Sequence, residues 1–212
     1  MFTPTKEMLA SLLRDVSGRM SPKRFAHTAA VADMVARLGE LYCSERVDML
    51  RAAALLHDLT KEWDTATQEA FLTSHGENLT STEKLAPKTH HARTAALLIP
   101  EQYPEFADSD LLSCIRYHTT GRADMTLCEK LVYLADYIDD TRTFPDCVTL
   151  RAAFWDADPG AMTCEQRLCH LDDVLIMSFD MTIRALVEER TPVHPDTMSA
   201  RNDLLVQKAR RK

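Results

Sequence analysis

Apolar residues recur at intervals of three and four positions through most of this chain, which is the spacing of one face of an α-helix. One such face follows the Ser21-Pro22 pair, and it consists of His27, Val31, Met34 and Leu38. A second face follows it in the chain, and it consists of Val47, Leu50, Ala54 and His57. Both helices therefore turn a histidine toward the core.

The composition supports helices from end to end. Only five glycines are present, and residues that lose little side-chain freedom in a helix, such as alanine, leucine and glutamate, are abundant. No alternating run of valine, isoleucine and threonine predicts a strand. Helices are therefore expected at about 5–16, 22–42, 47–57, 64–74, 90–99, 108–118, 126–138, 150–155 and 163–188.

This pattern predicts an all-α protein with the fold of a single-domain helical bundle. Residues 1–20 should form an N-terminal helix that packs on the core, and residues 21–190 should form the main domain. The proline-rich segment 191–195 ends the last long helix. Residues 191–212 are then expected to be a C-terminal extension with a short helix and the basic tail 208–212.

Charge and cysteine content limit the functional classes. The formal charge of −7 argues against broad binding to a nucleic acid polymer, and no apolar stretch is long enough to predict a membrane span. The six cysteines form no C-x-x-C pair, and the N-terminus does not look like a secretory signal. Reduced thiols in a cytoplasmic protein are the simplest interpretation.

Histidine and aspartate stand out on five of the predicted helices. The residues are His27, the His57-Asp58 doublet, the His90-His91 pair, His118 and Asp136. Imidazole and carboxylate ligands suit iron, manganese, cobalt, nickel or zinc, and a carboxylate such as Asp58 can bridge two ions. A water between two such ions loses its proton near neutral pH and can attack phosphorus. This constellation predicts a site for two divalent metals and hydrolysis of a phosphoester or phosphoanhydride.

Each of these residues also has a simpler explanation. A single core histidine is usually just hydrogen-bonded, but so many ionisable groups on inward faces are costly unless they are paired or metal-bound. Adjacent residues point about 100° apart on a helix, so only one residue of the His90-His91 pair is expected to bind a metal. We expect this ligand to be His91. His75, His170 and His194 are interpreted as surface or capping residues.

Basic residues lie within a few positions of these candidate ligands. They are Arg24, Lys61, Arg93, Arg116, Arg122 and Arg142. Arginine can hold a phosphate with a two-pronged contact and lysine as a point charge, so the group could clamp a polyphosphate. The same arginines could equally lie on solvated helix faces.

Three longer motifs resemble a known family. The order of the ligands resembles the HD superfamily of metal-dependent phosphohydrolases. The segments 54–62 (ALLHDLTKE), 115–122 (IRYHTTGR) and 125–138 (MTLCEKLVYLADYI) resemble more closely the YqeK family of bacterial symmetrical bis(5'-nucleosyl)-tetraphosphatases. This resemblance spans about residues 24–195. It implies an HD-type helical fold over residues 21–190, hydrolysis of diadenosine tetraphosphate to two ADP, and a two-metal site that holds iron.

The resemblance also assigns roles to individual positions. It implies the metal ligands His27, His57, Asp58, His91, His118 and Asp136, with Asp58 and Lys61 as catalytic residues. The substrate-binding set implied is Arg24, Lys61, His91, His118, Thr119, Thr120, Gly121, Arg122 and Arg142. Gly121 would let the backbone approach a phosphate, to which the neighbouring threonine hydroxyls can donate.

Some positions depart from the family pattern. The family often has Glu-Pro before the arginine that follows the metal-binding aspartate, and here Asp139, Asp140 and Thr141 precede Arg142. Ala95 stands where the family often has glycine, and Arg93-Thr94 replaces a more common Pro-Val pair. These differences bear on the fit of the substrate and leave the metal ligands complete.

Two alternative functions stay open. Another HD-type nucleotide phosphohydrolase, such as a nucleotidase or a guanosine tetraphosphate hydrolase, would share every metal ligand and differ in its pocket. A nonenzymatic nucleotide-sensing domain would keep the helical scaffold without turnover. The expected partner is a nucleotide, with no membrane and no nucleic acid polymer, and a homodimer is compatible with the sequence.

Overall fold

The computed structural model describes residues 2–211, and every regular element within that range is a helix. The longer helices are α1 (Lys6–Arg19), α2 (Pro22–Tyr42), α3 (Val47–Leu56), α4 (Thr65–Ser74), α6 (His90–Gln102), α7 (Ser109–Arg116), α8 (Leu127–Ile138), α9 (Pro145–Trp155), α10 (Cys164–Glu188) and α11 (Pro195–Arg210). Shorter elements are α5 (Ser81–Lys84) and the 3₁₀ helices η1 (Ser44–Arg46), η2 (Pro87–Thr89) and η3 (Pro104–Phe106). The all-α prediction is confirmed.

Side chains at the helix starts explain several of these boundaries. Ser21 accepts a hydrogen bond from the backbone amide of Arg24, and Pro22 occupies the first turn of α2. Thr126 and Glu129 form a capping box at the start of α8, in which each side chain satisfies a free backbone amide of the other residue. Local sequence signals therefore mark the starts of α2 and α8, two of the helices that carry candidate ligands.

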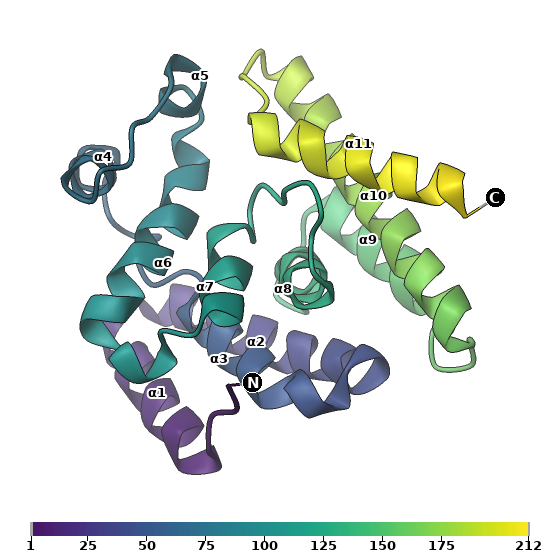
Figure 1. Cartoon of the computed structure of the whole chain (residues 1–212), viewed down its shortest axis with the longest axis horizontal. Coiled ribbons are helices and arrows are strands. Elements are labelled where there is room, and N and C mark those ends of the chain that lie inside the picture. The colour runs from purple at the N-terminus through teal and green to yellow at the C-terminus, as the bar shows by residue number, and fades with distance from the viewer. Residues whose placement is uncertain (1, 212) are drawn as a thin grey trace.

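Helix α2 packs against both α3 and α8, which also contact each other, and α1 packs against α3 at the lower left of Figure 1. At the α2–α3 contact, a Cβ added to Gly39 would lie 2.9 Å from the Val47 side chain, so only glycine allows this close approach. Helix α8 also contacts α7 and α9, and it is seen end-on near the centre of Figure 1. This arrangement brings residues from both halves of the chain around α8.

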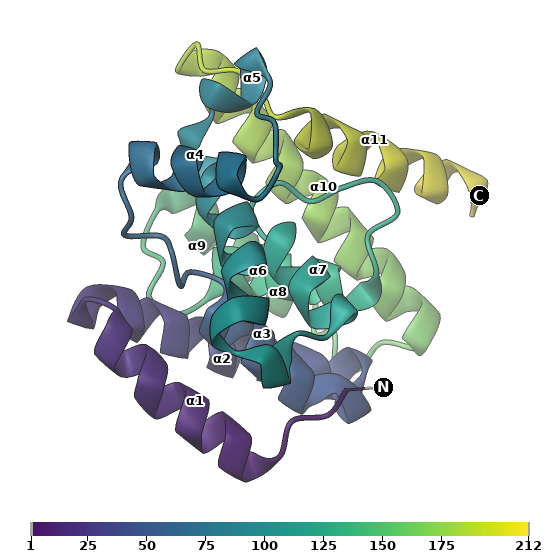
Figure 2. The same ribbon diagram turned by 60° about the vertical axis from the view of Figure 1, so that its left-hand side comes forward.

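The C-terminal part forms a second layer. Helix α10 packs against α9 and α11, and Figure 2 shows α11 along the upper right, with α10 descending beneath it toward the lower right. Ala200 and Leu204 of α11 are buried, and α1 similarly buries Leu12 and Val16. The division into a main domain at 21–190 with two flanking segments stays a prediction.

Several predicted boundaries are wrong. Helix α9 begins at Pro145 and not near residue 150, because a proline is well tolerated in a first helical turn. Helix α6 continues past Pro100 to Gln102. The C-terminal helix has 16 residues and is not short, so Lys208 and Arg210 lie in its last turn and not in a separate tail. Lys212 lies outside the described residues.

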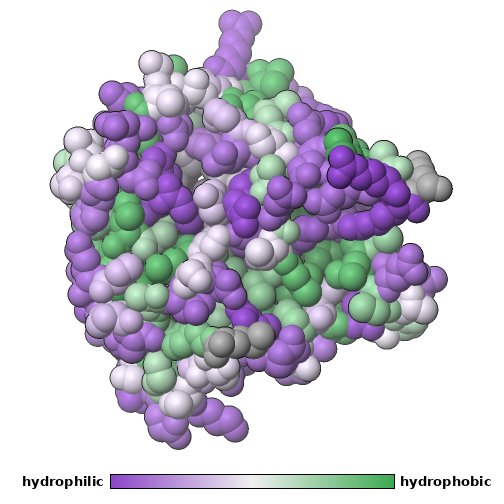
Figure 3. All heavy atoms as spheres, viewed as in Figure 1, coloured by the Kyte–Doolittle hydropathy of each residue, from purple (hydrophilic) through white to green (hydrophobic). Residues whose placement is uncertain are grey.

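The surface mixes polar and apolar residues. On the face seen in Figure 3, apolar residues lie in separate patches between polar ones. Within residues 2–211, the helices include none with the length and apolar character needed to cross a bilayer.

Candidate metal centre and nucleotide pocket

Six candidate ligands from five parts of the chain meet in the interior. They are all buried, with at most 9% of any residue exposed, and they are His27, His57, Asp58, His91, His118 and Asp136. Helices α2, α6 and α8 supply one residue each, and the others lie at the C-terminal ends of α3 and α7. Residues that are as much as 109 positions apart in the chain, from His27 to Asp136, therefore form one cluster.

Asp58 lies at the centre of the cluster. Its Oδ1 is 3.2 Å from His91 Nε2 and 3.8 Å from His118 Nε2. Its Oδ2 is 3.4 Å from His57 Nε2 and 3.7 Å from His27 Nε2. Each carboxylate oxygen thus faces a different pair of imidazoles, which is the arrangement that a carboxylate bridging two cations requires.

Asp136 completes one side of the cluster. Its Oδ1 lies 2.9 Å from His27 Nε2 and 3.9 Å from His57 Nε2. The ligand atoms of His27, His57 and Asp136 all lie within 4.8 Å of one another, and so do those of His57, Asp58 and His118. Two overlapping groups of this kind are compatible with two adjacent metal positions.

Backbone carbonyls orient two of the imidazoles. His57 Nδ1 lies 2.6 Å from the carbonyl oxygen of Ala54, and His118 Nδ1 lies 2.7 Å from that of Ile115. A carbonyl only accepts, so each Nδ1 carries the proton and each Nε2 presents a lone pair to the cluster. Within the described residues, the buried His57 Nε2 has no hydrogen-bond partner. A cation would satisfy this nitrogen, so the residues present fit a metal.

The protonation states also suit metal binding. Burial opposes the charged carboxylate, but the neighbouring histidines hold the pKa of Asp58 well below its ordinary value. The pKa of Asp136 is likewise well below its ordinary value, because Arg142 and His27 outweigh burial. Burial lowers the pKa of His91 and of His118. Near neutral pH the cluster thus presents ionised carboxylates at Asp58 and Asp136 and neutral imidazoles at His91 and His118, and these are the forms that bind cations.

His27 differs from the other imidazoles. Burial opposes its charged form, but hydrogen bonds to Asp136 and Asp139 raise its pKa to about 9. Asp139 Oδ2 lies 3.3 Å from His27 Nδ1, opposite the nitrogen that faces the cluster. Asp139 was not among the predicted site residues. Its position three residues after Asp136, at the end of the same helix, could have suggested this supporting role.

Three cations border the cluster. Arg24 Nη1 donates to Asp58 Oδ2 at 2.5 Å, and Arg142 Nη2 donates to Asp136 Oδ1 at 2.5 Å. Lys61 Nζ lies 3.2 Å from His91 Nε2, and burial lowers the pKa of this lysine. These positive groups stand next to the carboxylates, where they could also contact the oxygens of a bound phosphate.

A cavity of about 510 Å³ adjoins the cluster. Lys61, Asp136 and Arg142 line its inner end, and Thr119 lies in its wall. The rest of the wall comes from the segment around η2, from α8, α9 and α10, and from the segment that leads into α11. It includes Leu85, Pro87, Tyr137, Cys147, Thr182, Leu186, Pro192 and His194. Sequence reasoning missed most of this wall because, apart from Tyr137, it comes from segments far from the ligands in the chain and without conspicuous chemistry.

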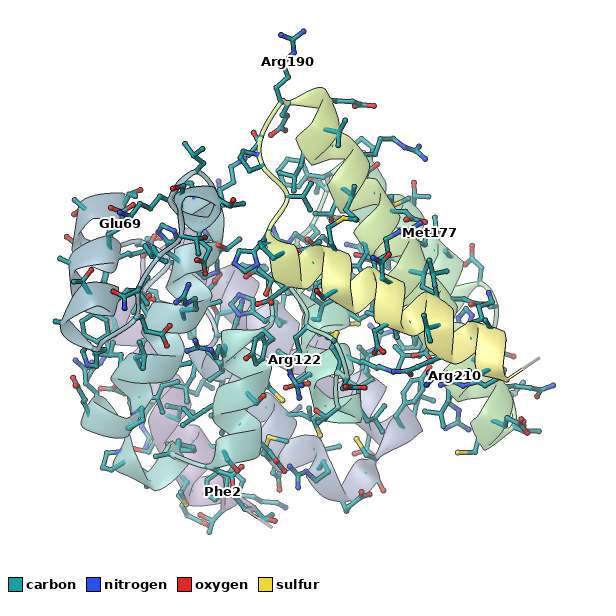
Figure 4. The ribbon with its side chains drawn as sticks, turned by 45° about the horizontal axis from the view of Figure 1, so that its top comes forward. Phe2, Glu69, Arg122, Met177, Arg190 and Arg210 are labelled. Atoms are coloured by element: carbon teal, nitrogen blue, oxygen red, sulfur yellow. The ribbon has the colours of Figure 1, made fainter. Side chains whose placement is uncertain are left out.

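Not every predicted substrate residue lines this cavity. The Arg122 guanidinium pairs with Glu129 at 3.0 Å and stacks over the Tyr117 ring, 5.3 Å from its centroid. Figure 4 shows its side chain in the loop that precedes α8, and Asp124 of this loop donates its amide to Asp203 of α11. A substrate contact by Arg122 would require it to leave Glu129.

Gly121 and Thr120 also have structural explanations. Gly121 has a φ of +62°, and a Cβ there would lie 2.7 Å from the Phe179 ring and 2.9 Å from Ala200. Packing against α10 and α11 therefore explains this glycine without a phosphate. The hydroxyl of Thr120 donates to the carbonyl oxygen of Gly121.

Two other predicted cations form a separate polar network. Arg93 pairs with Glu77 and Glu83, and Arg116 pairs with Glu77 at 2.8 Å. They line a cavity of about 110 Å³ next to the larger one. His194 borders both cavities. The structure does not bring these two arginines to the metal cluster.

The remaining histidines lie outside the cluster. His90 Nε2 lies 3.0 Å from the carbonyl oxygen of Glu83, so the choice of His91 over His90 agrees with the geometry. His194 is the N-cap of α11, as expected of a capping residue, but it is buried. His75 lies 2.8 Å from Glu101, and His170 stacks on Phe154.

The sequence matches the model of the HD domain family over residues 24–141, which is more than half of the chain. This range includes all six candidate ligands. Two relatives named "Bis(5'-nucleosyl)-tetraphosphatase, symmetrical" are similar over almost the whole length. The one from Halalkalibacterium halodurans is 30% identical over 92% of this chain and 96% of its own. The one from Bacillus subtilis is 29% identical over 90% of this chain and 94% of its own.

A solved structure is similar as well. It is described as a "predicted HD superfamily hydrolase involved in NAD metabolism from Clostridium acetobutylicum". It is 29% identical to this chain, with a TM-score of 0.78, and the match covers 97% of this chain and all of that one. The helical arrangement is thus shared with a protein that is described as a predicted HD superfamily hydrolase.

Proposed function

This chain belongs to the HD domain family, and we propose that it is a metal-dependent hydrolase that cleaves diadenosine tetraphosphate symmetrically into two ADP. The observation that carries the proposal is Asp58, whose two oxygens face two different pairs of imidazoles beside a cavity large enough for a nucleotide. The names of the relatives support the choice of substrate.

In this proposal, His27, His57, Asp58, His91, His118 and Asp136 hold two divalent ions. Such ions, when bound, lower the pKa of a coordinated water and stabilise negative charge on phosphoryl oxygens. Iron is the proposed metal, with manganese, cobalt, nickel and zinc compatible with the same ligands. The role of Asp139 is to hold the His27 ring, because it contacts the nitrogen on the far side.

The cations orient the phosphates. Lys61 and Arg142 lie at the inner end of the cavity, next to Asp136, and can neutralise the oxygens of one diphosphate. Arg24 lies against Asp58 and can turn toward the same oxygens. The Thr119 hydroxyl is buried, has no hydrogen-bond partner in the described part of the chain, and lines the cavity, so it is available to donate to the substrate.

The size of the cavity supports the proposal that the central phosphoanhydride bond of the substrate is the one cleaved. A volume of about 510 Å³ accommodates one ADP-sized unit, with its terminal phosphate toward Asp58 and its base toward Tyr137, Leu186 and Pro192. The second half of the substrate then extends outward, and the reacting phosphorus belongs to the central anhydride. Two equal products result.

Separation of the products tests this proposal. Protein that was purified anaerobically and analysed for metal should convert diadenosine tetraphosphate into ADP alone. ATP plus AMP would refute the symmetrical placement. A panel that includes mononucleotides and guanosine tetraphosphate separates the proposal from another HD-type phosphohydrolase, and absence of both metal and turnover would favour a nonenzymatic domain.

The cellular location and the oligomeric state of the protein are part of the same proposal. All six cysteines are free, which agrees with the proposed cytoplasmic location. A homodimer stays a prediction that size-exclusion chromatography with light scattering can test.

A further inference from the structure

The segment between α8 and α9 supports both the metal cluster and the cavity. Residues 139–144, which we call the α8–α9 loop, contain neither glycine nor proline, so no ring fixes their backbone angles. Asp139 Oδ2 lies 3.3 Å from His27 Nδ1. Arg142 lines the cavity and donates from Nη2 to Asp136 Oδ1 at 2.5 Å. The conformation of the α8–α9 loop therefore determines where two groups of the site lie.

One side chain of α9 holds this loop. Arg151 donates from Nε to the carbonyl oxygen of Ile138 at 2.8 Å. Its Nη2 donates to the carbonyl oxygen of Asp139 and, at 2.7 Å, to that of Arg142. The guanidinium also lies 3.9 Å from Asp140, whose side chain is 74% exposed, and an ion pair so open to solvent contributes little. The three backbone carbonyls are therefore the main partners of Arg151.

These hydrogen bonds fix the loop and not only the end of α8. The last carbonyls of a helix lack partners within the helix, and a basic side chain commonly binds them. That explanation applies to Ile138 and Asp139, but Arg142 lies outside the helix. A rigid guanidinium that binds carbonyls before and after the turn sets the distance between them. The Arg142 backbone is thus held by Arg151, while its guanidinium is held by the carbonyl oxygen of Asp136, at 2.9 Å, and by the carboxylate of the same residue.

We propose that Arg151 is a positioning residue that directs the Arg142 guanidinium toward the phosphates of the substrate. This inference rests on the proposed function, in which Arg142 neutralises the oxygens of one diphosphate. Among the described residues, those that line the cavity include Arg142 but not Arg151. Arg151 therefore acts through the α8–α9 loop and makes no contact with the substrate.

Removal of the Arg151 guanidinium should release the loop. Three carbonyl oxygens then lose their donors, and water can replace these donors because the Arg151 side chain is 23% exposed. A misplacement of about 1 Å in a group that positions the substrate can lower the rate about 10²-fold. Because Arg142 keeps its contacts with Asp136, the value of kcat/KM should fall by about 10- to 10²-fold.

Steady-state kinetics of the metal-loaded, full-length protein tests the inference. Arg151→Met preserves the length of the side chain and removes its donors, so kcat/KM for diadenosine tetraphosphate should fall about 10- to 10²-fold with unchanged metal content. Arg151→Lys keeps a cation that can reach fewer of the carbonyls, and it should recover part of this loss. Arg14→Met, at an exposed position on α1, is the control and should match the parent protein. Loss of metal from Arg151→Met would overturn the inference, because Arg151 would then act on the ligands and not on Arg142.

A double-mutant cycle separates positioning from a general structural role. If Arg151 acts through Arg142, Arg151→Met should change kcat/KM by less than about threefold in a protein that already carries Arg142→Met. An equal loss of activity in both backgrounds would overturn the inference. Far-UV circular dichroism and urea titration check that each variant folds, and Arg151→Lys replaces Arg151→Met in the cycle if the latter does not.

Hydrogen exchange tests the effect on the loop without a substrate. The amide of Thr141 donates to Asp139 Oδ1 at 2.8 Å, and the amide of Arg142 donates to the Asp139 carbonyl oxygen at 3.2 Å. Both amides should exchange faster in Arg151→Met, whereas peptides from α1 and α4 should exchange as in the parent protein. Exchange at the parent rate throughout residues 139–144 would overturn the inference.

Binding of ADP distinguishes failure of this inference from failure of the proposed function. Calorimetric titration of the manganese-loaded protein with ADP should give a Kd about tenfold higher for Arg151→Met than for the parent and Arg14→Met. Equal ADP affinity and equal turnover in Arg151→Met and the parent would refute the inference alone. A parent protein that neither binds ADP nor hydrolyses diadenosine tetraphosphate would refute the proposed function, and the inference with it.

Discussion

Replacement of Asp58 by asparagine is the most direct test of the cluster, because it preserves the shape of the side chain and removes its charge. Each oxygen of Asp58 faces two imidazoles, at 3.2–3.8 Å. The amide NH₂ of asparagine cannot ligate a metal, so either orientation of the amide deprives one position of its bridging oxygen. We therefore expect Asp58→Asn to lose at least one of the two ions.

The magnitude follows from the lost charge. Two unit charges about 4 Å apart interact by about 4 kcal/mol at an effective dielectric constant of about 20. That energy corresponds to a factor of about 10³ in an equilibrium constant, so metal affinity is expected to fall about 10³-fold. Hydrolysis should fall with it, because turnover requires both ions in this mechanism.

Metal analysis of purified protein and titration with manganese measure the affinity, and chromatography of ADP measures turnover. Asp33→Asn is the matched control, since Asp33 lies on α2 with 80% of its side chain exposed. Far-UV circular dichroism checks that the variant folds. An Asp58→Asn protein that keeps both ions and turns over within about threefold of the parent would refute the bridging role.

Three further predictions follow from single contacts. Lys61→Met should lower kcat/KM about 10²-fold, because the ammonium group that lines the cavity is lost. Steady-state kinetics measures this decrease, and metal analysis should show an unchanged metal content. Burial lowers the pKa of His194, so the unfolded chain binds its proton more readily and stability should fall as the pH drops below about 6.5. The His194→Asn variant replaces the capping Nδ1 with an amide oxygen that does not titrate, and it should flatten this part of the curve of melting temperature against pH. Gly121→Ala should destabilise the fold by about 2–4 kcal/mol in urea titration because of its positive φ and the nearby Phe179 ring, whereas Gly18→Ala, which has open space around it, should not.

Local signals in the sequence predicted most of the helices. Ser21-Pro22 marked the start of α2 because a hydroxyl and a proline suit a first turn, and the intervals of three and four residues placed His27 and His57 on buried faces. The same signals failed for α11, whose length depends on packing of Ala200 and Leu204 against the rest of the fold. Short-range patterns do not contain that information.

The candidate ligands were identifiable because metal binding uses few residue types. His57 and Asp58 are adjacent in the chain, and the intervals of three and four residues place His27 and His57 on inward helix faces. Basic residues were harder to assign, because arginine also serves on ordinary surfaces. Arg142 reaches Asp136, but Arg122 is held by Glu129, and only the tertiary arrangement separates the two.

By itself, the sequence determined the helical class, several helix starts such as that of α2, and the residue types at the candidate metal cluster, since each of these depends on neighbours along the chain. The tertiary structure decided which oxygen of Asp58 faces which imidazole, which cations reach the cavity, and that Asp139 supports His27. These relations depend on distances between segments that are far apart in the chain, and such distances are fixed only when the helices pack.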